Sequence, residues 1–396
     1  MKSLNYSRNR MKSIYTILFL FLSFIFSALS QEKMKFPKID LAQDSTAEKQ
    51  ECGHNHFNLG SHSSGISFGN SKYHNGIRFN YRDCDVKHVN GLNFTLWQGY
   101  EQTLKDFTIN GISLGTIPVG GTMNGITFGF AGAIAMRNMT GINFGGLALV
   151  SPGGNITGIN ISGLGIVSPG GSITGINFGG LALVSPGGNI TGLNFGGLAV
   201  VSAGGSITGV NVSSLALVSP DGNITGLNFG GLAVVSPGGD IKGINIAGLA
   251  LVSPGGSITG INFGGLAVVS PGGDIKGINI SGLAIVSPTG NITGVNATLG
   301  VLNSPNGITG VNLAGYKIEA KKITGLNIAP VWIETESITG LTVTGYCKVK
   351  GTQTGVSIAL VNNAEFLNGL QIGLLNIARQ NSGLNILPFV NLHLGL

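Results

Sequence analysis

Ile173-Thr-Gly-Ile-Asn-Phe-Gly-Gly-Leu-Ala-Leu-Val-Ser-Pro-Gly-Gly-Asn189 is one copy of a 17-residue repeat, and the next copy begins at Ile190. The first Gly of the copy recurs at a constant interval throughout residues 139–303. A fixed period this short indicates a repeat architecture, in which each copy builds one unit that buries its core against its neighbours. The recurring glycines are Gly141, Gly158, Gly175, Gly192, Gly209, Gly226, Gly243, Gly260, Gly277 and Gly294.

Each copy contains two short apolar runs separated by glycine. Ile-Thr-Gly-Ile-Asn-Phe and Leu-Ala-Leu-Val-Ser are rich in branched and aromatic residues, and they are bounded by Gly-Gly and by Pro-Gly-Gly-Asn. Runs of this length and composition predict β-strands, and 67 glycines among 396 residues oppose helix formation. Pro fixes φ and Gly accepts positive φ, so Pro-Gly predicts a tight turn that closes each unit.

An asparagine stands two residues after the first Gly of every copy. If successive copies stack in parallel and in register, these side chains form a ladder of amide hydrogen bonds, which favours in-register stacking. In an antiparallel meander each Asn would instead lie opposite a different position, or slot, of the neighbouring repeat. Keeping Asn at one fixed position would then give no Asn–Asn hydrogen bonds. The predicted structural ladder includes Asn160, Asn177, Asn194, Asn211, Asn228, Asn245, Asn262 and Asn279. The next slot, which holds Phe178 and Phe195, is expected to form a second, apolar ladder.

We therefore predict an all-β protein built as a β-solenoid of tandem 15–17-residue repeats. One copy forms one coil with two strands, and the corners lie at Gly-Gly and at Pro-Gly-Gly.

The sequence leaves a second architecture open, a transmembrane β-barrel or antiparallel meander with one strand per repeat. Apolar segments of about ten residues with polar links are typical of such barrels, and the alternating apolar residues of the C-terminus, Val390–Leu396, resemble a barrel's terminal strand. Two features oppose it: the links are nearly all alike, and neither face carries the charge of a polar lumen. The charges within 139–303 are Asp221, Asp240, Lys242, Asp274 and Lys276.

The N-terminus, residues 1–30, has the pattern of a secretory signal peptide. A basic start precedes the apolar run 14–26, and the small residues Ala28 and Ser30 precede Gln31. Met11 offers an alternative start to Met1. We expect an exported protein.

Composition divides the rest of the chain into four parts. The terminal repeats are expected to be atypical because they cap the stack. The parts are a flexible polar leader at 31–63, irregular N-terminal repeats at 64–138, regular repeats at 139–303, and shorter repeats with a terminal strand at 304–396.

The formal net charge of +6 comes largely from the signal peptide. Residues 1–30 hold four basic residues and no acidic one, so the remainder has 18 basic and 16 acidic residues, a net charge of +2. A nucleic-acid-binding protein needs a clustered basic face, and the sequence shows none, so we expect no nucleic-acid partner.

Cysteine and histidine gather near the start of the repeats. In an extended segment Cys52, His54 and His56 would share one face, which makes them candidates for a zinc or copper site. Their spacing matches no tight structural motif, so we favour a polar lead-in to the first strands, with no metal and no cofactor. Cys52 and Cys84 are candidates for a disulfide bond in an exported chain, and Cys347 is expected to be a buried apolar filler.

Two segments fit the G-x-S-x-G pattern of a nucleophilic serine, 65–69 around Ser67 and 111–115 around Ser113. That motif requires a strand-to-helix elbow with His and acidic partners. Here Ser takes the Asn slot of the repeat. The repeats contain no paired carboxylates or phosphate loop, so we expect no catalytic residues and no enzyme.

Gly369-Leu-Gln-Ile-Gly-Leu-Leu-Asn-Ile-Ala378 and Leu387-Pro-Phe-Val-Asn-Leu-His393 resemble a group of bacterial surface repeat-containing proteins. Those proteins share a signal peptide, many Gly-Ile-x-Ile-Gly-Gly-Leu units and a similar C-terminal ending. The resemblance covers residues 64–396 and implies export to the cell surface or outer membrane of a bacterium with two membranes. It implies no activity, and the 17-residue spacing and Pro-Gly-Gly turns depart from it.

The sequence therefore favours a non-enzymatic surface, structural or adhesion protein, with an outer-membrane β-barrel acting as a pore or scaffold as the alternative. The partner is not specified by the sequence. A flat, uncharged repeat face could meet a glycan, another protein or a second copy of itself.

Overall fold

The computed structural model describes residues 52–61, 63–99, 106–380 and 384–394. The chain divides into two compact units, Met1–Cys52 and Gly53–Leu396, and the fold below is that of the second. The predicted signal peptide, 1–30, and the first part of the predicted leader lie outside the described residues. In the described ranges no helix has the length and apolarity that a membrane crossing requires.

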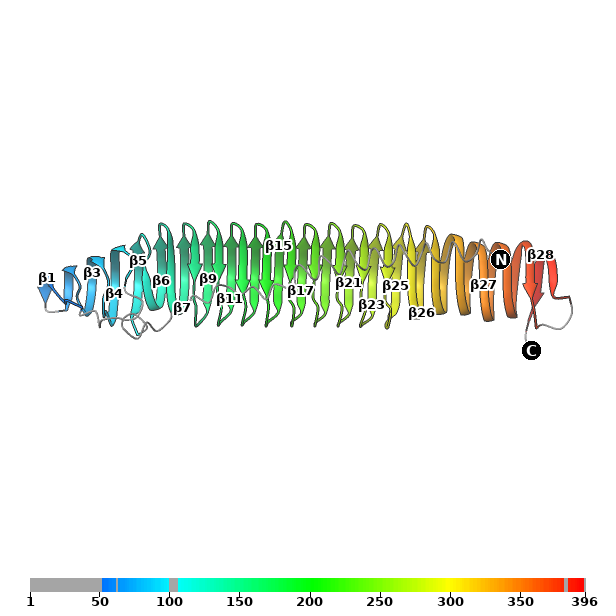
Figure 1. Cartoon of the computed structure of the whole chain (residues 1–396), viewed down its shortest axis with the longest axis horizontal. Helices are drawn as coiled ribbons and strands as arrows, with labels where there is room; N and C mark the ends of the chain where they lie inside the picture. The colour runs from blue at the N-terminus through cyan, green and yellow to red at the C-terminus, as the bar shows by residue number, and fades with distance from the viewer. Residues whose placement is uncertain (1–51, 62, 100–105, 381–383, 395–396) are drawn as a thin grey trace, which may run out of the picture. The chain divides into compact units, whose positions relative to one another are not determined.

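Each coil of the regular region contains one long and one short strand, and successive coils lie side by side (Figure 1). The long strands are β9 (Ile156–Ser162), β11 (Ile173–Gly179), β13 (Ile190–Gly196), β15 (Ile207–Ser213), β17 (Ile224–Gly230), β19 (Ile241–Ala247), β21 (Ile258–Gly264), β23 (Ile275–Ser281) and β25 (Asn291–Thr298). The short strands are β8 (Ala148–Val150), β10 (Gly165–Val167), β12 (Ala182–Ser185), β14 (Ala199–Ser202), β16 (Ala216–Val218), β18 (Ala233–Val235), β20 (Ala250–Val252), β22 (Ala267–Val269) and β24 (Ala284–Val286).

The coils at the two ends are less regular. The N-terminal ones contain β1 (His56–Ser61), β2 (Ser64–Gly69), β3 (Tyr73–Arg82), β4 (His88–Trp97), β5 (Thr108–Gly115), β6 (Val119–Gly129) and β7 (Gly132–Gly145). The C-terminal ones contain β26 (Val301–Ala314), β27 (Lys317–Ala378) and β28 (Ile386–His393). Strand β27 winds through several coils without a break, because the shorter repeats after residue 303 lack the Pro-Gly-Gly turn.

Neighbouring coils pair in parallel, residue for residue. Strand β11 pairs with β9 and β13 so that Asn177 lies opposite Asn160 and Asn194, and the same holds for every slot of the strand. The short strands form a second parallel ladder in the same way. This pairing confirms the predicted β-solenoid. It contradicts the alternative barrel or antiparallel meander, because each copy folds as a two-strand coil and consecutive copies run in the same direction.

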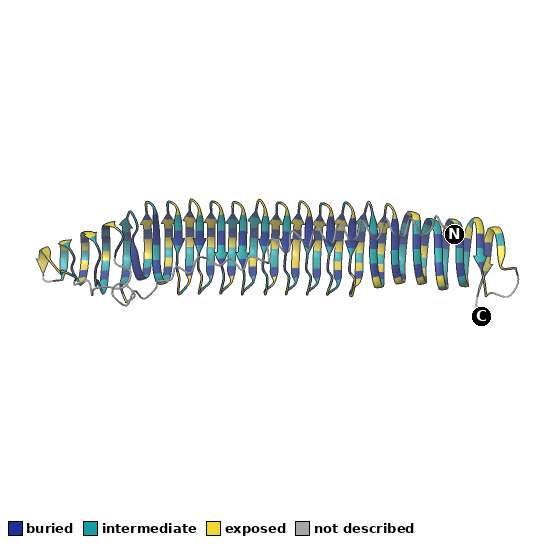
Figure 2. Ribbon diagram, in the orientation of Figure 1, coloured by how far each residue is buried: buried dark blue, intermediate teal, exposed yellow. Residues whose placement is uncertain are grey.

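The core of each coil is narrow and holds few apolar side chains. Ile173 of the long strand and Leu183 of the short strand are fully buried and belong to one continuous cluster that runs through the coils. Strand residues alternate between the inside and the outside, so Asn177 points inward whereas Ile176 and Phe178 point outward and are about half exposed. Figure 2 shows buried and exposed bands recurring from coil to coil.

Both ends of the stack are closed by an antiparallel strand. Strand β1, which lies at the end of the predicted leader, pairs antiparallel with β2. Strand β28 pairs antiparallel with the last part of β27. The alternation at Val390–Leu396 predicted a terminal strand up to the last residue; the strand that is present, Ile386–His393, covers the first part of that range, and residues 395–396 lie outside the described residues.

Candidate functional site

The interior carries the predicted ladder of asparagine amides. Asn177 Nδ2 donates to Asn194 Oδ1 at 2.8 Å, and its own Oδ1 accepts from Asn160 Nδ2 at 2.8 Å. The pattern continues without a gap from Asn143 to Asn327, with every donor pointing toward the next coil. These side chains are buried, so the ladder stabilises the stack and offers no group to a ligand.

The ladder has an unsatisfied acceptor at its N-terminal end. Asn143 Oδ1 is buried and has no hydrogen-bond partner. The residue opposite it in the preceding coil is Thr127, which is also buried. A buried acceptor without a donor costs free energy, and supplying the donor recovers it.

Replacing Thr127 by Asn is therefore expected to stabilise the protein. The new amide would donate to Asn143 Oδ1 and extend the ladder by one step, for a gain of about 1 kcal/mol in the free energy of unfolding. Urea unfolding of the wild-type and T127N proteins measures the change. T127V serves as the control, because it leaves the acceptor unpaired, and a gain in T127V equal to that in T127N would contradict the hydrogen-bond explanation.

The two serines of the G-x-S-x-G segments lie in the ladder slot. Ser67 stands opposite Arg78 and Ser113 opposite Asn93, and both serines are buried. Neither lies on a strand-to-helix turn, since both are within strands. The interpretation of these residues as Ser variants of the Asn slot is confirmed.

The first coils contain a buried ion pair that the sequence analysis missed. Arg78 occupies the Asn slot, and its Nη1 donates to Asp83 Oδ1 at 2.6 Å and to Asn93 Oδ1 at 2.7 Å. Its Nε donates to Ser71 Oγ at 3.1 Å and its Nη2 to Asn70 Oδ1 at 3.2 Å. A buried charge needs such paired and hydrogen-bonded surroundings. The available signal was the arginine itself, at a repeat position that should face inward.

The candidate metal ligands take part in other interactions. Cys52 and Cys84 are disulfide-bonded, whereas Cys347 is a free thiol. His54 Nε2 lies 3.4 Å from Asp85 Oδ2, and His56 Nδ1 lies 2.8 Å from the carbonyl oxygen of His54. Among the residues that the structure describes, no group of three or more His, Cys, Asp and Glu side chains is arranged to hold a metal ion.

Cys347 is fully buried, as predicted. Burial raises the pKa of its thiol to about 11, because a charged thiolate is disfavoured away from water. Cys347 therefore remains protonated and unreactive at neutral pH.

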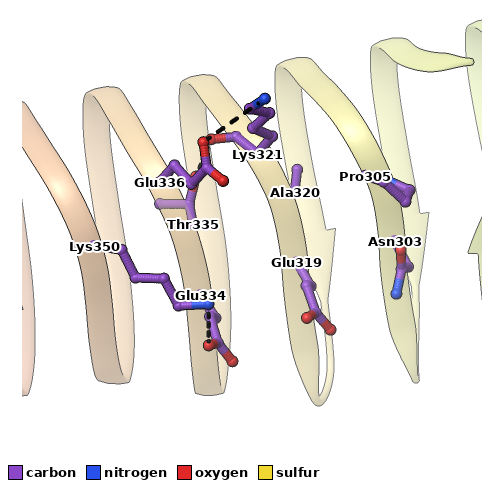
Figure 3. A pocket seen from close by; sticks show the side chains of 9 residues that line it. All are labelled: Asn303, Pro305, Glu319, Ala320, Lys321, Glu334, Thr335, Glu336 and Lys350. Atoms are coloured by element: carbon purple, nitrogen blue, oxygen red, sulfur yellow. Dashed lines mark hydrogen bonds and ion pairs between the residues drawn. The ribbon is translucent and has the colours of Figure 1, made fainter.

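A cluster of charged residues lines a shallow pocket of about 270 Å³ on the C-terminal coils (Figure 3). Glu334 is one of the lining residues and pairs with Lys317 and Lys348, both at 3.3 Å, and with Lys350 at 3.1 Å. Burial acts to raise the pKa of Glu334, but the hydrogen bond from Lys350 and the charges of Lys317 and Lys348 outweigh it, so the pKa lies below its usual value. The buried Lys317 also stands 4.5 Å from the ring centroid of Trp332.

Replacing Glu334 by Gln is expected to lower the free energy of unfolding by about 2–3 kcal/mol at pH 7, because it removes a partner of a buried ammonium group. Thermal or urea unfolding measures the change. The folded-state pKa of Glu334 is lowered, so its contribution is complete above the unfolded-state pKa of about 4.3 and is lost as the pH falls through the lower folded-state value. The difference between wild type and E334Q should therefore shrink below about pH 4.

The matched control for this prediction is E336Q. Glu336 lines the same pocket, but it is exposed and its partner Lys321 is 4.0 Å away. An exposed ion pair contributes at most about 1 kcal/mol. Equal destabilisation in the two variants would contradict the role assigned to burial.

The outer side of the long strands carries a continuous stripe of exposed apolar side chains. We call this stripe the apolar face. It comprises two outward slots of each long strand and the Leu at the adjoining corner, for example Ile176, Phe178 and Leu181, which are 45%, 51% and 46% exposed. Its other exposed members in the regular coils are Ile142, Phe144, Leu147, Ile159, Ile161, Leu164, Leu193, Leu198, Leu215, Leu227, Phe229, Leu232, Ile244, Ile246, Leu249, Ile261, Phe263, Leu266, Ile278, Ile280, Leu283 and Val295.

The apolar face is the predicted second ladder, placed on the outside of the coils. Phe128 and Phe144 stack in adjacent coils with ring centroids 4.9 Å apart, and Phe178 and Phe195 lie 6.4 Å apart. The opposite side of each coil differs, because the short strand presents Ala and Val residues that are mostly half-buried or buried, such as Val184. Within the regular coils that the structure describes, the side of the long strands is therefore the strongly apolar one.

The size of the apolar face makes it the candidate functional site. If each of roughly two dozen half-exposed side chains contributes about 70 Å² of apolar surface, the face amounts to on the order of 1,700 Å². The largest exposed apolar patch of a typical monomeric protein is about 300–600 Å², and larger ones mark surfaces of interaction.

Comparison with known proteins gives no further assignment. No protein-family model, curated protein or solved structure matches the chain. The molecule is a β-solenoid repeat protein with 17-residue coils and an interior Asn ladder, and the resemblance to bacterial surface repeat proteins stays an expectation from the sequence.

Proposed function

We propose that the chain is an exported, non-catalytic structural protein of the cell surface, and that its solenoid presents the apolar face for association. The observation that carries the proposal is the apolar face itself, in which exposed Ile, Phe and Leu side chains repeat in the same slots of successive coils. Contiguous exposed apolar surface larger than that of a typical monomeric protein marks a surface of interaction.

Two further features support a structural role. The interior of the regular coils holds the apolar core, the Asn ladder and buried serines such as Ser185, whose Oγ donates to the carbonyl oxygen of Gly171, so the coils present one repeated surface. Charged side chains pair with one another at the ends of the stack, as Glu334 does with its three lysines.

Export is supported by the signal-peptide pattern of residues 1–30 and by the disulfide-bonded state of Cys52 and Cys84. Disulfide bonds persist mainly in oxidising compartments. The surface of a bacterium with two membranes is the location that the sequence resemblance implies.

The test is to express the full chain with a C-terminal epitope tag in a bacterium with two membranes. We expect a processed chain beginning at Gln31, accessible to protease on intact cells and retained by the envelope through a high-salt wash. Leu20→Arg, which places a charge in the apolar run of the signal peptide, should keep the chain unprocessed inside the cell. An unprocessed wild-type chain in the cytoplasm would overturn the proposal.

A further inference from the structure

We infer that the apolar face binds a second copy of this chain, so that two solenoids pack face to face along their apolar stripes. The inference rests on the proposed function in one respect, namely that the face is a surface of association. It goes further by identifying the partner.

The first argument is the match of spacing. Parallel strands lie about 4.8 Å apart, and each slot of the apolar face recurs once per coil in unbroken register, as Phe178 and Phe195 do. A second copy offers the same side chains at the same interval, so the projecting residues of one face can fill the gaps of the other over its whole length. Identical ladders on facing sheets form dry, interdigitated interfaces in this way.

The second argument is the absence of net charge from the face. In the regular coils the charged residues beside it are Lys242 and Lys276, which take the slot otherwise held by Thr. Each lysine is paired at 2.7 Å, with Asp240 and Asp274 respectively. Two copies can therefore approach without like-charge repulsion.

The same charge pattern disfavours a lipid surface. Peripheral proteins that insert apolar residues into a membrane generally add Lys or Arg residues that attract anionic headgroups. Here each of the two lysines beside the face is already paired with the aspartate two residues before it in the chain.

The third argument is area. The face exposes on the order of 1,700 Å² on each copy, about twice the 800 Å² per partner of a standard stable interface. An overlap of only half the coils would still bury enough surface for a stable dimer.

The structure also indicates where association stops. Only one side of each coil is strongly apolar, because the short strands present smaller and less exposed residues such as Val184 and Val269. A pair that uses the same patch on both copies is related by a two-fold axis and is closed. We therefore expect a dimer, with no continued growth into sheets or fibres.

The experiment measures the mass of the purified, processed protein in detergent-free buffer by sedimentation equilibrium and light scattering. The wild type should have twice the mass of the chain. Phe178→Lys combined with Phe263→Lys places two charges within the face and should weaken dimerisation at least 100-fold, giving a monomer. Val184→Lys combined with Val269→Lys places the same charges on the opposite side of the same two coils and should leave the dimer intact.

Far-UV circular dichroism and urea unfolding show whether each variant is folded, and the opposite-side variant shows what two added lysines do to the fold. A monomeric wild type, or a dimer that survives Phe178→Lys with Phe263→Lys, would overturn the inference. Binding of the wild type to phosphatidylcholine vesicles with loss of the dimer would also overturn it, in favour of a lipid partner. The proposed function would stand if an exported protein at the cell surface proved to be monomeric in solution, so the two failures are distinguishable.

Discussion

Replacing Asn211 by Asp is expected to lower the free energy of unfolding by about 3–5 kcal/mol at pH 7, since it leaves an uncompensated charge in the interior. Asn211 is fully buried, donates to Asn228 Oδ1 at 2.8 Å and accepts from Asn194 Nδ2 at 2.7 Å. An aspartate keeps the acceptor but turns the donor into a second acceptor, which then faces the oxygen of Asn228. Thermal and urea unfolding measure the loss.

The pH dependence of N211D gives a second readout. Burial disfavours the charged carboxylate and raises its pKa, so the destabilisation should be small at low pH and grow as the pH rises above the unfolded-state value of about 3.9. A loss of stability that did not change with pH would show that charge is not its cause.

The matched control is N189D, the same chemical change on the outside of the solenoid. Asn189 lies in the exposed turn and its Oδ1 accepts from the backbone N–H of Ser206 at 2.8 Å. The same slot holds Asp240 and Asp274 in later coils, where Asp240 accepts from the backbone N–H of Ser257 in the same way. We expect N189D to change stability by less than about 0.5 kcal/mol. Similar losses in N189D and N211D would contradict the role assigned to the ladder.

Replacing Gly158 by Ala is expected to cost about 3–5 kcal/mol, at the upper end of what single substitutions do. Gly158 has a φ of 114°, a region that only glycine occupies readily. An added Cβ would also overlap the carbonyl oxygen of Gly141 in the preceding coil, so the parallel pairing of the two coils would have to open. Hydrogen exchange of the amides in β9 and β11, together with urea unfolding, measures the effect.

Gly165 in the same coil is the control for Gly158. Its φ is not positive, and the nearest atom to an added Cβ is the carbonyl oxygen of Ala182 at 3.3 Å. Its neighbours in register, Ala148 and Ala182, already carry a Cβ in this slot. G165A should be neutral or stabilise the protein by up to about 1 kcal/mol, because alanine restricts the unfolded chain. Equal changes in the free energy of unfolding for G158A and G165A would contradict the explanation that Gly158 is required for its positive φ.

The period and the Asn slot favoured the β-solenoid that the structure shows over the barrel that the sequence left open. A constant repeat interval indicates that equivalent residues of successive repeats have equivalent surroundings. Asn177 forms amide hydrogen bonds with the Asn of its neighbours only if it lies opposite Asn160 and Asn194, and the parallel register places it there. The two corners and the two strands per coil followed from Gly-Gly and Pro-Gly-Gly. The barrel alternative failed because it would have paired each copy antiparallel with the next.

The sequence did not reveal which apolar slots face outward. Ile173 and Ile176 are both isoleucines of one strand, yet the first is buried and the second is exposed. Hydrophobicity alone would place both inside and Asn177 outside. Strand alternation decides their positions, because residues three apart in one strand point to opposite faces, so with Ile173 inside the coil Ile176 lies outside and Asn177 lies inside.

The irregular ends were harder still to predict. The Arg78–Asp83 pair forms within one of the irregular N-terminal repeats, and the lysines Lys317 and Lys348 reach Glu334 from neighbouring coils. Local spacing does not specify such contacts. The pairing of Cys52 and Cys84 stayed open for the same reason, because three cysteines in a sequence allow more than one bond.

The antiparallel strands β1 and β28 at the two ends have a consequence for how such a gene can change. Every regular coil meets its neighbours through the same slots, so an insertion or deletion of one 17-residue copy leaves both end strands with the partners they had. Each added copy lengthens the solenoid by one strand spacing, about 4.8 Å. The length of the solenoid is therefore set by the number of repeats in the gene. Unequal recombination within the repeats can change that length by whole coils, and each resulting protein keeps a complete set of strand pairings.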